Sequence, residues 1–179
     1  MAICVLNKDL KRSEYCGYSL NEISKIYLAN FEDVASVATG TCTSGGVQVS
    51  GITMESGKVW YEITPAKNSA SFSDALVSSD NGAKYRVHTI NFSFNGAYDC
   101  SMPDVVDALS LGKFIAVVVN ADGSYLMLGR VMGLEADSDG ANYGGEGEEA
   151  AGLTVVLSGN QAESVLPLSD AAIEVVVGD

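Results

Sequence analysis

Residues 65–96 read PAKNSASFSDALVSSDNGAKYRVHTINFSFNG, and this stretch decides the fold class. Two extended runs, residues 69–78 and 84–95, lie on either side of Asp80-Asn81-Gly82. Asn-Gly between two such runs is a strong hairpin signal, because both residues tolerate the positive φ of a tight turn. The stretch therefore predicts a long antiparallel β-hairpin over residues 69–95.

The second run of this hairpin carries a change of phase. Tyr85, Val87 and Thr89 share one face, whereas the apolar side chains from Ile90 onward take the other. A strand alternates with period two, so this pattern predicts a bulge or a change of covered face near His88 and Thr89.

The predicted second strand is about twelve residues long, against the usual five or six. Hairpins of this length often project beyond their own domain and pair with a neighbour. Lys84, Arg86 and His88 share one face of the run, so we expect His88 on the surface or at an interface. The candidates for an assembly interface are Asp80, Asn81, Gly82, Lys84, Arg86 and His88.

Most of the remaining chain also reads as strands. Alternating or continuous apolar runs predict strands over residues 22–30, 47–49, 58–64, 113–120, 124–133, 152–158 and 172–177. Turns are expected over residues 40–46 and 55–57, a loop over 162–167, and an Asp-Gly hairpin turn at Asp122 and Gly123. Residues 1–21 are expected to form an N-terminal arm.

One short helix is predicted after Ser101, which can cap its first turn. Pro103 suits the first helical positions, and Asp104 and Asp107 favour the positive end of the helix. Gly112 ends it. The chain is therefore expected to form a single mainly β domain over residues 1–179, a sandwich or barrel with one short α-helix.

Composition supports a folded, soluble protein. Apolar residues make up 47% of the chain and charged residues 18%. No run approaches the roughly 20 apolar residues that span a bilayer, so no membrane partner is expected. Cys4, Cys16, Cys42 and Cys100 are widely spaced, which favours reduced thiols over a zinc site or a disulfide scaffold.

The charge is strongly negative and unevenly distributed. The formal net charge is −13, and residues 90–179 hold fourteen acidic side chains but only two basic ones, Lys113 and Arg130. Specific binding to nucleic acid needs Lys and Arg for the phosphates, so this balance argues against it. An acidic wall would instead repel a phosphate backbone and let it pass.

The densest acidic stretch is residues 135–149, EADSDGANYGGEGEE, with six carboxylates and no base. Glu135, Asp137, Asp139, Gly140 and Glu146 follow the spacing of a calcium-binding EF-hand loop. The flanking segments read as strands rather than helices, which favours a flexible, solvated insertion over residues 135–150 and leaves weak calcium binding as the alternative. The acidic surface candidates are Glu135, Asp137, Asp139, Glu146, Glu148 and Glu149.

No catalytic, cofactor or metal site is predicted. His88 is the only histidine, and the chain has no GxSxG, no P-loop and no GxGxxG motif. The one acidic cluster near an ordered element is Asp99, Asp104 and Asp107. A hydrolase acting through two carboxyl groups would need such side chains to converge in a cleft, and the alternative is that they stabilise the helix start.

Three segments together resemble the tail tube proteins of tailed bacteriophages. They are WYEITPAKNSASFSDALVSSDNGAKYRVHTINFSFNG, DVVDALSLGKFIAVVVNADGSYLMLGRVMGLE and AAGLTVVLSGNQAESVLPL, within residues 58–168. The order matters as much as the residues: a long hairpin, a short helix, a strand pair about an Asp-Gly turn, an insertion and a final strand.

This resemblance implies a β-sandwich or barrel subunit that assembles as a homohexameric ring. Rings would stack into a tube around a tape-measure protein, beside neighbouring tail proteins, and DNA would pass through without specific binding. It also implies a location in the virion tail, with assembly in the host cytoplasm, and no enzymatic role or cofactor.

Two alternatives stay open at this point. A head–tail connector, tail terminator or baseplate ring would use a similar subunit. A monomeric β-sandwich that binds carbohydrate or protein would instead expose aromatic side chains. The aromatic candidates are Trp60, Tyr61, Tyr85, Tyr98, Tyr125 and Tyr143.

Overall fold

A computed structural model describes residues 22–95, 100–142 and 152–178 of the chain. The fold is mainly β, with large antiparallel sheets, and is consistent with a single-domain β-sandwich, as the sequence predicted. The predicted N-terminal arm, residues 1–21, lies outside the described residues. The strands are β1 (Ile23–Asn30), β2 (Val34–Thr41), β3 (Val47–Met54), β4 (Tyr61–Ile63), β5 (Ser71–Ser78), β6 (Lys84–Asn95), β7 (Lys113–Asn120), β8 (Tyr125–Leu128), β9 (Leu134–Asn142), β10 (Gly152–Gln161) and β11 (Leu166–Pro167).

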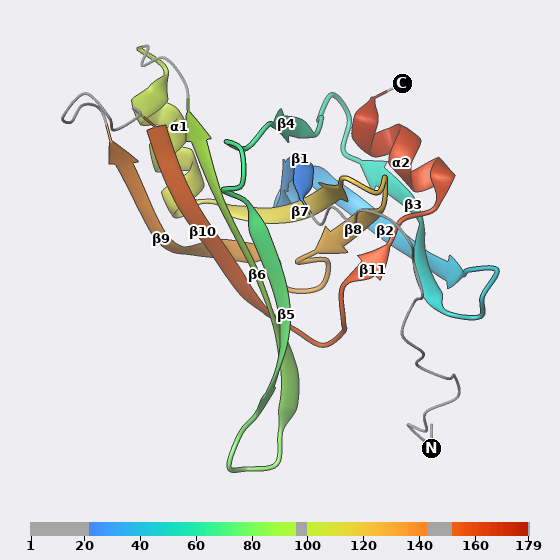
Figure 1. The fold of residues 1–179 in the computed structure, drawn as a ribbon. Helices are drawn as coiled ribbons and strands as arrows, with labels where there is room; N and C mark the ends of the chain where they lie inside the picture. Colours follow the sequence, from blue (N-terminus) through green and yellow to red (C-terminus); the bar gives the residue numbers. More distant parts are fainter. Residues whose placement is uncertain (1–21, 96–99, 143–151, 179) are drawn as a thin grey trace, which may run out of the picture.

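Nine of these strands form one sheet that folds over on itself (Figure 1). Its order is β11-β8-β7-β9-β10-β6-β5, and β1 pairs with the other edge of β7 and with β4. Strands β2 and β3 form a separate two-stranded sheet. The helices are α1 (Met102–Leu111) and α2 (Asp170–Val177), and a short 3₁₀ turn, Phe31–Asp33, follows β1.

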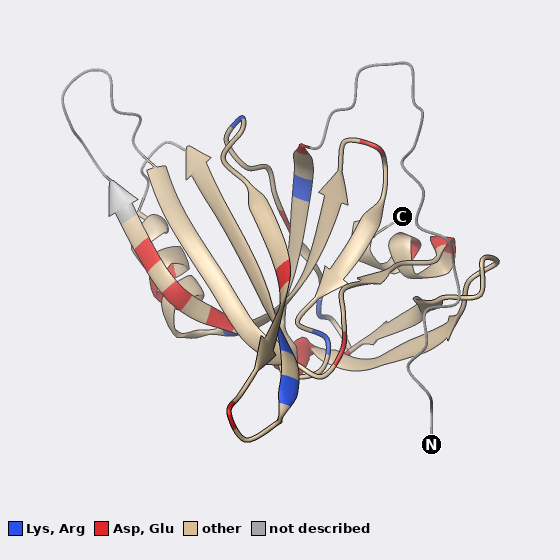
Figure 2. Ribbon diagram, turned by 60° about the horizontal axis from the view of Figure 1, so that its bottom comes forward, with Lys and Arg blue, Asp and Glu red and all other residues tan. Residues whose placement is uncertain are grey.

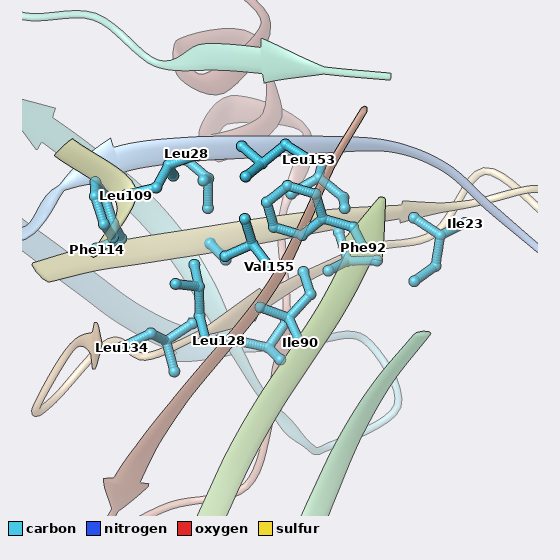
Figure 3. Packing of buried hydrophobic residues seen from close by; sticks show 14 residues of the cluster. Ile23, Leu28, Ile90, Phe92, Leu109, Phe114, Leu128, Leu134, Leu153 and Val155 are labelled. Carbon is cyan, nitrogen blue, oxygen red and sulfur yellow. The ribbon is translucent and has the colours of Figure 1, made fainter. Parts of the chain in front are cut away.

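Strands β1 and β7 form the middle layer of the molecule. Their side chains are buried on both faces, as the run KFIAVVVN in β7 predicts for a strand covered on each side. One face contributes Leu28 and Val118 to a core shared with β6, β9, β10 and α1 (Figure 3). The other face contributes Tyr27 and Val117 to a second core, which β3 and α2 cover.

The long hairpin is confirmed. Strands β5 and β6 pair from Ser71 opposite Asn91 to Ser78 opposite Lys84. The predicted irregularity near His88 is wrong, because β6 keeps an unbroken register with both β5 and β10. His88, Ile90 and Phe92 are all buried. The face of β6 that points into the molecule at the apolar residues therefore also points inward at His88.

The helix α1 is confirmed, with Ser101 at the N-cap, Pro103 in the first turn and Gly112 at the C-cap. The hairpin of β7 and β8 around Asp122 and Gly123 is also confirmed. The predicted strand over residues 172–177 is wrong: this segment lies in the helix α2, so the fold has two helices rather than one.

Capping residues explain the helical state of α2. The Ser169 side chain accepts a hydrogen bond from the Ala172 N–H, and Gly178 ends the helix in the left-handed region at φ 81°. Ala172 and Val176 then lie one helical turn apart on the face that packs on the second core. Burial of that face outweighs the strand propensity of the Val-rich sequence.

The predicted insertion over residues 135–150 is wrong in its first half. Residues 135–142 lie in β9, which pairs with β10 from Ser158 opposite Glu135 to Gly152 opposite Asn142. Strong pairing to an apolar neighbour strand orders a segment whose own composition favours a loop. Residues 143–150 lie outside the described residues. The smaller corrections are that β2 extends through Thr41 and that the expected loop 162–167 ends in the short strand β11.

Candidate functional site

The tip of the long hairpin is the turn between β5 and β6, at one end of the sheet's edge strand. Asp80, Asn81, Gly82 and Lys84 are all exposed, and Gly82 has a φ of 80°. The pairing of β6 with β10 ends at Arg86, so the end of the hairpin beyond it is held only by β5 (Figure 1). Four of the six predicted interface residues therefore share a projecting surface.

The outer edge of β5 has no strand partner among the described residues. On this strand, Leu76 is 59% exposed. An open edge with an exposed large apolar side chain is a surface on which another strand can pair.

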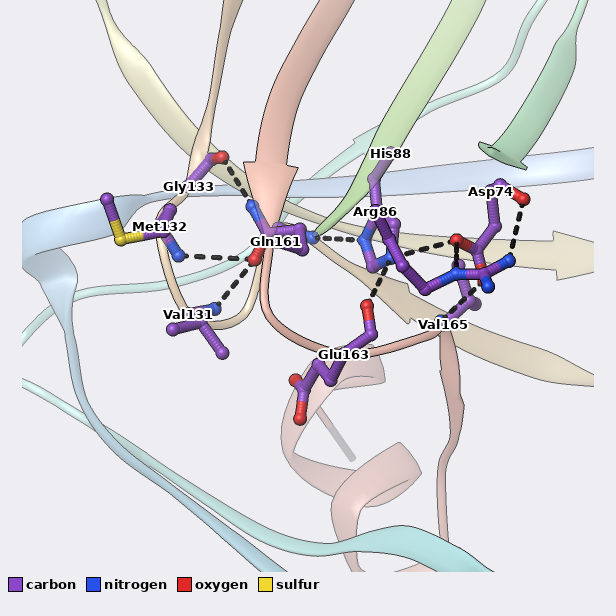
Figure 4. Close-up of polar contacts among 10 residues, drawn as sticks. Asp74, Arg86, His88, Val131, Met132, Gly133, Gln161, Glu163 and Val165 are labelled. Atoms are coloured by element: carbon purple, nitrogen blue, oxygen red, sulfur yellow. Dashed lines mark hydrogen bonds and ion pairs between the residues drawn. The ribbon is translucent and has the colours of Figure 1, made fainter. Parts of the chain in front are cut away.

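The other two predicted interface residues, Arg86 and His88, turn toward the inside of the molecule. His88 is only 1% exposed, so the prediction of a surface or interface position for it is wrong. It shares the buried face of β6 with Ile90 and Phe92. Arg86 and His88 belong to a cluster of polar side chains at the base of the hairpin (Figure 4), here called the basal cluster. Its members are Asp74, Arg86, His88, Gln161 and Glu163, together with Arg130, which is paired with Glu163.

The His88 ring bridges two loops. Its Nδ1 accepts a hydrogen bond from the Gly129 N–H at 3.3 Å, and its Nε2 lies 3.0 Å from the Glu163 carbonyl oxygen. An N–H on one side and a carbonyl on the other select the neutral ring with its proton on Nε2. Burial lowers the pKa of His88, and the nearby Asp74 carboxylate opposes that effect without overcoming it.

Asp74 on β5 joins the hairpin to the segment before β11. Its carboxylate accepts hydrogen bonds from Arg86 Nε and, at 3.2 Å, from the Val165 N–H. Arg86 also donates to the Asp74 carbonyl at 2.9 Å. Burial raises the pKa of Asp74, but the hydrogen bonds from Arg86 and Val165 outweigh it and hold that pKa below its ordinary value.

The remaining members hold the turn between β8 and β9. Arg130 forms a two-pronged ion pair with Glu163, at 2.5 Å and 2.6 Å. The Gln161 side chain accepts hydrogen bonds from the N–H groups of Val131 and Met132 at 3.1 Å and 3.2 Å, and donates to the Gly133 carbonyl at 3.0 Å. The turn and the loop after β10 are thereby fixed to each other.

The basal cluster is therefore a closed network that fixes loops. His88 and Gln161 are each 1% exposed, so a dissolved substrate has no direct access to them. Its hydrogen bonds run between strands and loops that are far apart in the sequence, and they set the position from which the hairpin projects.

Sequence reasoning found only Arg86 and His88 of this cluster. Asp74, Arg130, Gln161 and Glu163 were missed because each lies in a run that reads as an ordinary strand or loop. One signal was available in the sequence. Arg86, His88, Ile90 and Phe92 follow one another at intervals of two residues, so an unbroken strand would place all four side chains on the same, inward face.

The acidic residues of β9 lie along an extended strand (Figure 2). Glu135 lies 3.4 Å from the Lys113 ammonium, whereas Asp139 accepts a hydrogen bond from Ser110 of α1 at 2.7 Å. Asp137 lies at a bulge, where the register with β10 shifts.

This arrangement is not that of an EF-hand loop, which wraps its ligands around one ion at 2.3–2.6 Å. Asp139 lies four residues after Glu135 along the extended strand, which places the two roughly 13 Å apart. Across residues 22–95, 100–142 and 152–178, no three His, Cys, Asp or Glu side chains lie close enough to share a metal ion. Glu146, Glu148 and Glu149 lie outside the described residues.

The two described carboxylates at the start of α1 do not converge on a buried cleft. Asp104 and Asp107 are exposed on the helix, and Asp99 lies outside the described residues. Within the described ranges, no helix is long and apolar enough to cross a membrane.

Aromatic side chains form no broad exposed patch over the described part of the chain. Tyr61 is 58% exposed, but Trp60 is buried and Tyr85 and Tyr125 are half-buried. Tyr98 and Tyr143 lie outside that part. Comparison of the chain with models of known protein families and with curated proteins finds no match to either.

Proposed function

We propose that this protein is a structural subunit that assembles into rings and stacks them into the tail tube of a tailed bacteriophage. The observation that carries the proposal is the long β5–β6 hairpin, which ends in an exposed turn and leaves the edge of β5 open. An open sheet edge is a liability in a monomer, and pairing with a neighbouring subunit removes it.

The geometry of the hairpin suits a contact between subunits in a ring. Its base is fixed by the basal cluster, so its direction is set by hydrogen bonds and ion pairs rather than by a loose loop. Its outer half presents Leu76 and the exposed Lys84. A neighbour that pairs with β5 would bury Leu76 and satisfy the free backbone groups of the strand.

The charge supports a tube that lets DNA pass. With fourteen acidic and two basic side chains in residues 90–179, the second half offers few groups that bind phosphate. Under this proposal the partners are other copies of the chain, in a ring that we expect to be hexameric, together with a tape-measure protein and neighbouring tail proteins. The location is the virion tail, after assembly in the host cytoplasm.

A connector, terminator or baseplate ring would use the same hairpin contact and differ in what it stacks on. A carbohydrate-binding module is not favoured, since Tyr61 is the one exposed aromatic ring among the described large apolar side chains. The tail tube is preferred over other rings because the order of elements in residues 58–168 resembles that family.

Negative-stain electron microscopy of the purified protein, from dilute to concentrated, tests the proposal. We expect rings or stacked tubes. The variant Leu76→Lys should abolish them, because it places a solvated charge where the neighbour's strand would pack. The matched control is Met132→Lys, because Met132 is similarly exposed, at 56%, but lies in the turn between β8 and β9.

Each outcome is informative. Rings that persist in Leu76→Lys would contradict the role of the hairpin edge. Featureless monomers at every concentration would contradict self-assembly. Closed rings that never stack would point to a connector or terminator instead of a tube.

A further inference from the structure

His88, the chain's only histidine, is 1% exposed and makes contacts that fit only its neutral form. Its Nδ1 faces the Gly129 N–H, which is a donor. A protonated ring carries a hydrogen on Nδ1 as well, so two donors would then point at each other. The other ring nitrogen already uses its hydrogen on the Glu163 carbonyl at 3.0 Å.

We propose that His88 is a proton-operated latch, which holds the turn between β8 and β9 and the loop between β10 and β11 against the base of the hairpin. Neutral His88 bridges Gly129 of the turn and Glu163 of the loop. Protonation at Nδ1 breaks the bond to Gly129 and loosens the turn, whereas the Nε2 hydrogen bond to the Glu163 carbonyl remains. This inference concerns the subunit alone and does not depend on the proposed assembly.

Charged groups approach His88 from both strands of the hairpin and from the loop between β10 and β11, whereas β10 places the uncharged Gly159 opposite it. Asp74 of β5 lies 3.6 Å from Nε2 and favours protonation, whereas Arg86 of the same strand as His88 opposes it. From the loop, Glu163 also favours protonation, but its carboxylate is paired with Arg130. Burial and the donor at Nδ1 act against the charged ring, so the latch is closed at neutral pH.

Protonation of His88 would break one of the neighbouring contacts and leave the others in place. Loss of the Gly129 bond frees the start of the turn, whose later residues, Val131 and Met132, are held separately by Gln161. On the loop side, the Arg130–Glu163 pair spans both segments and does not involve the His88 ring. The result is local loosening around Gly129, not unfolding of the sandwich.

The test is a proton and nitrogen NMR titration of the whole chain from pH 8 to pH 4.5. A single histidine gives one ring signal to follow without assignment of others. We expect its midpoint below the ordinary value of 6.5, and the Gly129 amide should shift with the same midpoint. Amide hydrogen exchange at Gly129, corrected for pH, should accelerate at least about tenfold below that midpoint, while Val117 in β7 stays protected.

Two variants separate the latch from a passive buried ring. His88→Gln supplies one acceptor and one donor group without a titration, so the protection of Gly129 should become independent of pH over the same range. Asp74→Asn removes a carboxylate that favours protonation, so the histidine midpoint should move to lower pH. A midpoint at or above 6.5, or a histidine titration that leaves the Gly129 amide unchanged, would overturn the proposal.

Discussion

Asp74 shows how one side chain can connect segments that are distant in the sequence. Its carboxylate receives hydrogen bonds from Arg86 on the next strand and from the Val165 N–H, ninety-one residues away. Its side chain is 18% exposed and that of Arg86 is 31% exposed, so both charges are partly withdrawn from water. A half-buried charge needs its partner, and the loss of one leaves the other poorly solvated.

Asp74→Ala should therefore lower the free energy of unfolding by about 2–4 kcal/mol, because it leaves Arg86 and the Val165 N–H without their acceptor. Urea denaturation followed by circular dichroism measures the change. The matched control is Asp80→Ala at the exposed hairpin tip, which should change stability by no more than about 0.5 kcal/mol. Equal effects of the two substitutions would show that the basal cluster does not stabilise the fold.

The pH dependence of stability should carry the signature of His88. Its pKa is 6.5 in the unfolded chain and lower in the folded one, so the unfolded state binds the proton first as pH falls. Its contribution to stability is thus fully present above pH 6.5 and is lost as pH falls from there through the folded pKa. Asp74 acts in a separate window, since its pKa is lowered from 3.8 and its contribution is lost only in stronger acid.

Wild-type protein should lose stability between pH 7 and pH 5, and His88→Gln should lose less over that range. Urea midpoints at half-unit pH intervals measure both curves. Parallel curves for the two proteins would mean that His88 has the same pKa folded and unfolded, contrary to the buried neutral ring.

At the scale of elements, sequence prediction succeeded where a signal is local. The Asp80-Asn81-Gly82 and Asp122-Gly123 turns determine their hairpins through residues that tolerate positive φ, and Gly82 and Gly123 both have it. The helix α1 has its own start and stop residues. In each case the turn or helix is determined by residues that lie close together in the sequence.

Prediction failed where packing or pairing with a segment distant in the sequence decides whether residues form a helix, a strand or a loop. The segment that forms α2 is Val-rich and reads as a strand, but its inward face is buried in the second core, where the helix contacts β3. The acidic half of β9 reads as a loop, but β10 orders it. The basal cluster was mostly missed for the same reason, since its hydrogen bonds join residues that sequence spacing does not relate.

The close approach of β10 to the turn before β9 gives a sharp test at this scale. A Cβ added at Gly159 would lie 2.2 Å from the Gly133 carbonyl oxygen, which is backbone and cannot swing aside. Gly159→Ala should destabilise the protein by at least about 2 kcal/mol, because the strand and the turn must separate. Thermal unfolding followed by circular dichroism measures the loss.

The matched control is Gly140→Ala on the neighbouring strand β9, where an added Cβ meets nothing within 4 Å. It should leave stability unchanged or raise it by up to about 1 kcal/mol, since alanine has less backbone freedom to lose. A Gly159→Ala variant as stable as this control would mean that the turn is not seated against β10.

At the scale of the whole molecule, the two cores share β1 and β7. One core lies between these strands and the β6–β10 half of the sheet, and the other lies between them and the layer of β3 and α2. Because each middle strand is packed on both faces, neither core can be exposed without removing support from the other. The sandwich is therefore expected to unfold as one cooperative unit.

Trp60 provides a probe of this coupling, because it is the only tryptophan and belongs to the second core. Leu157 of β10 is fully buried in the first core. Leu157→Ala should cost about 3 kcal/mol through the lost contacts and the cavity left behind. If the cores are one unit, the tryptophan fluorescence transition in urea must shift by the same amount as the circular dichroism transition.

The matched control is Leu111→Ala, because Leu111 is 87% exposed at the end of α1 and should leave both transitions in place. A Leu157→Ala variant in which circular dichroism shifts but Trp60 fluorescence does not would divide the chain into two separately folding layers. Coincident shifts mean that the two cores unfold together as one cooperative unit.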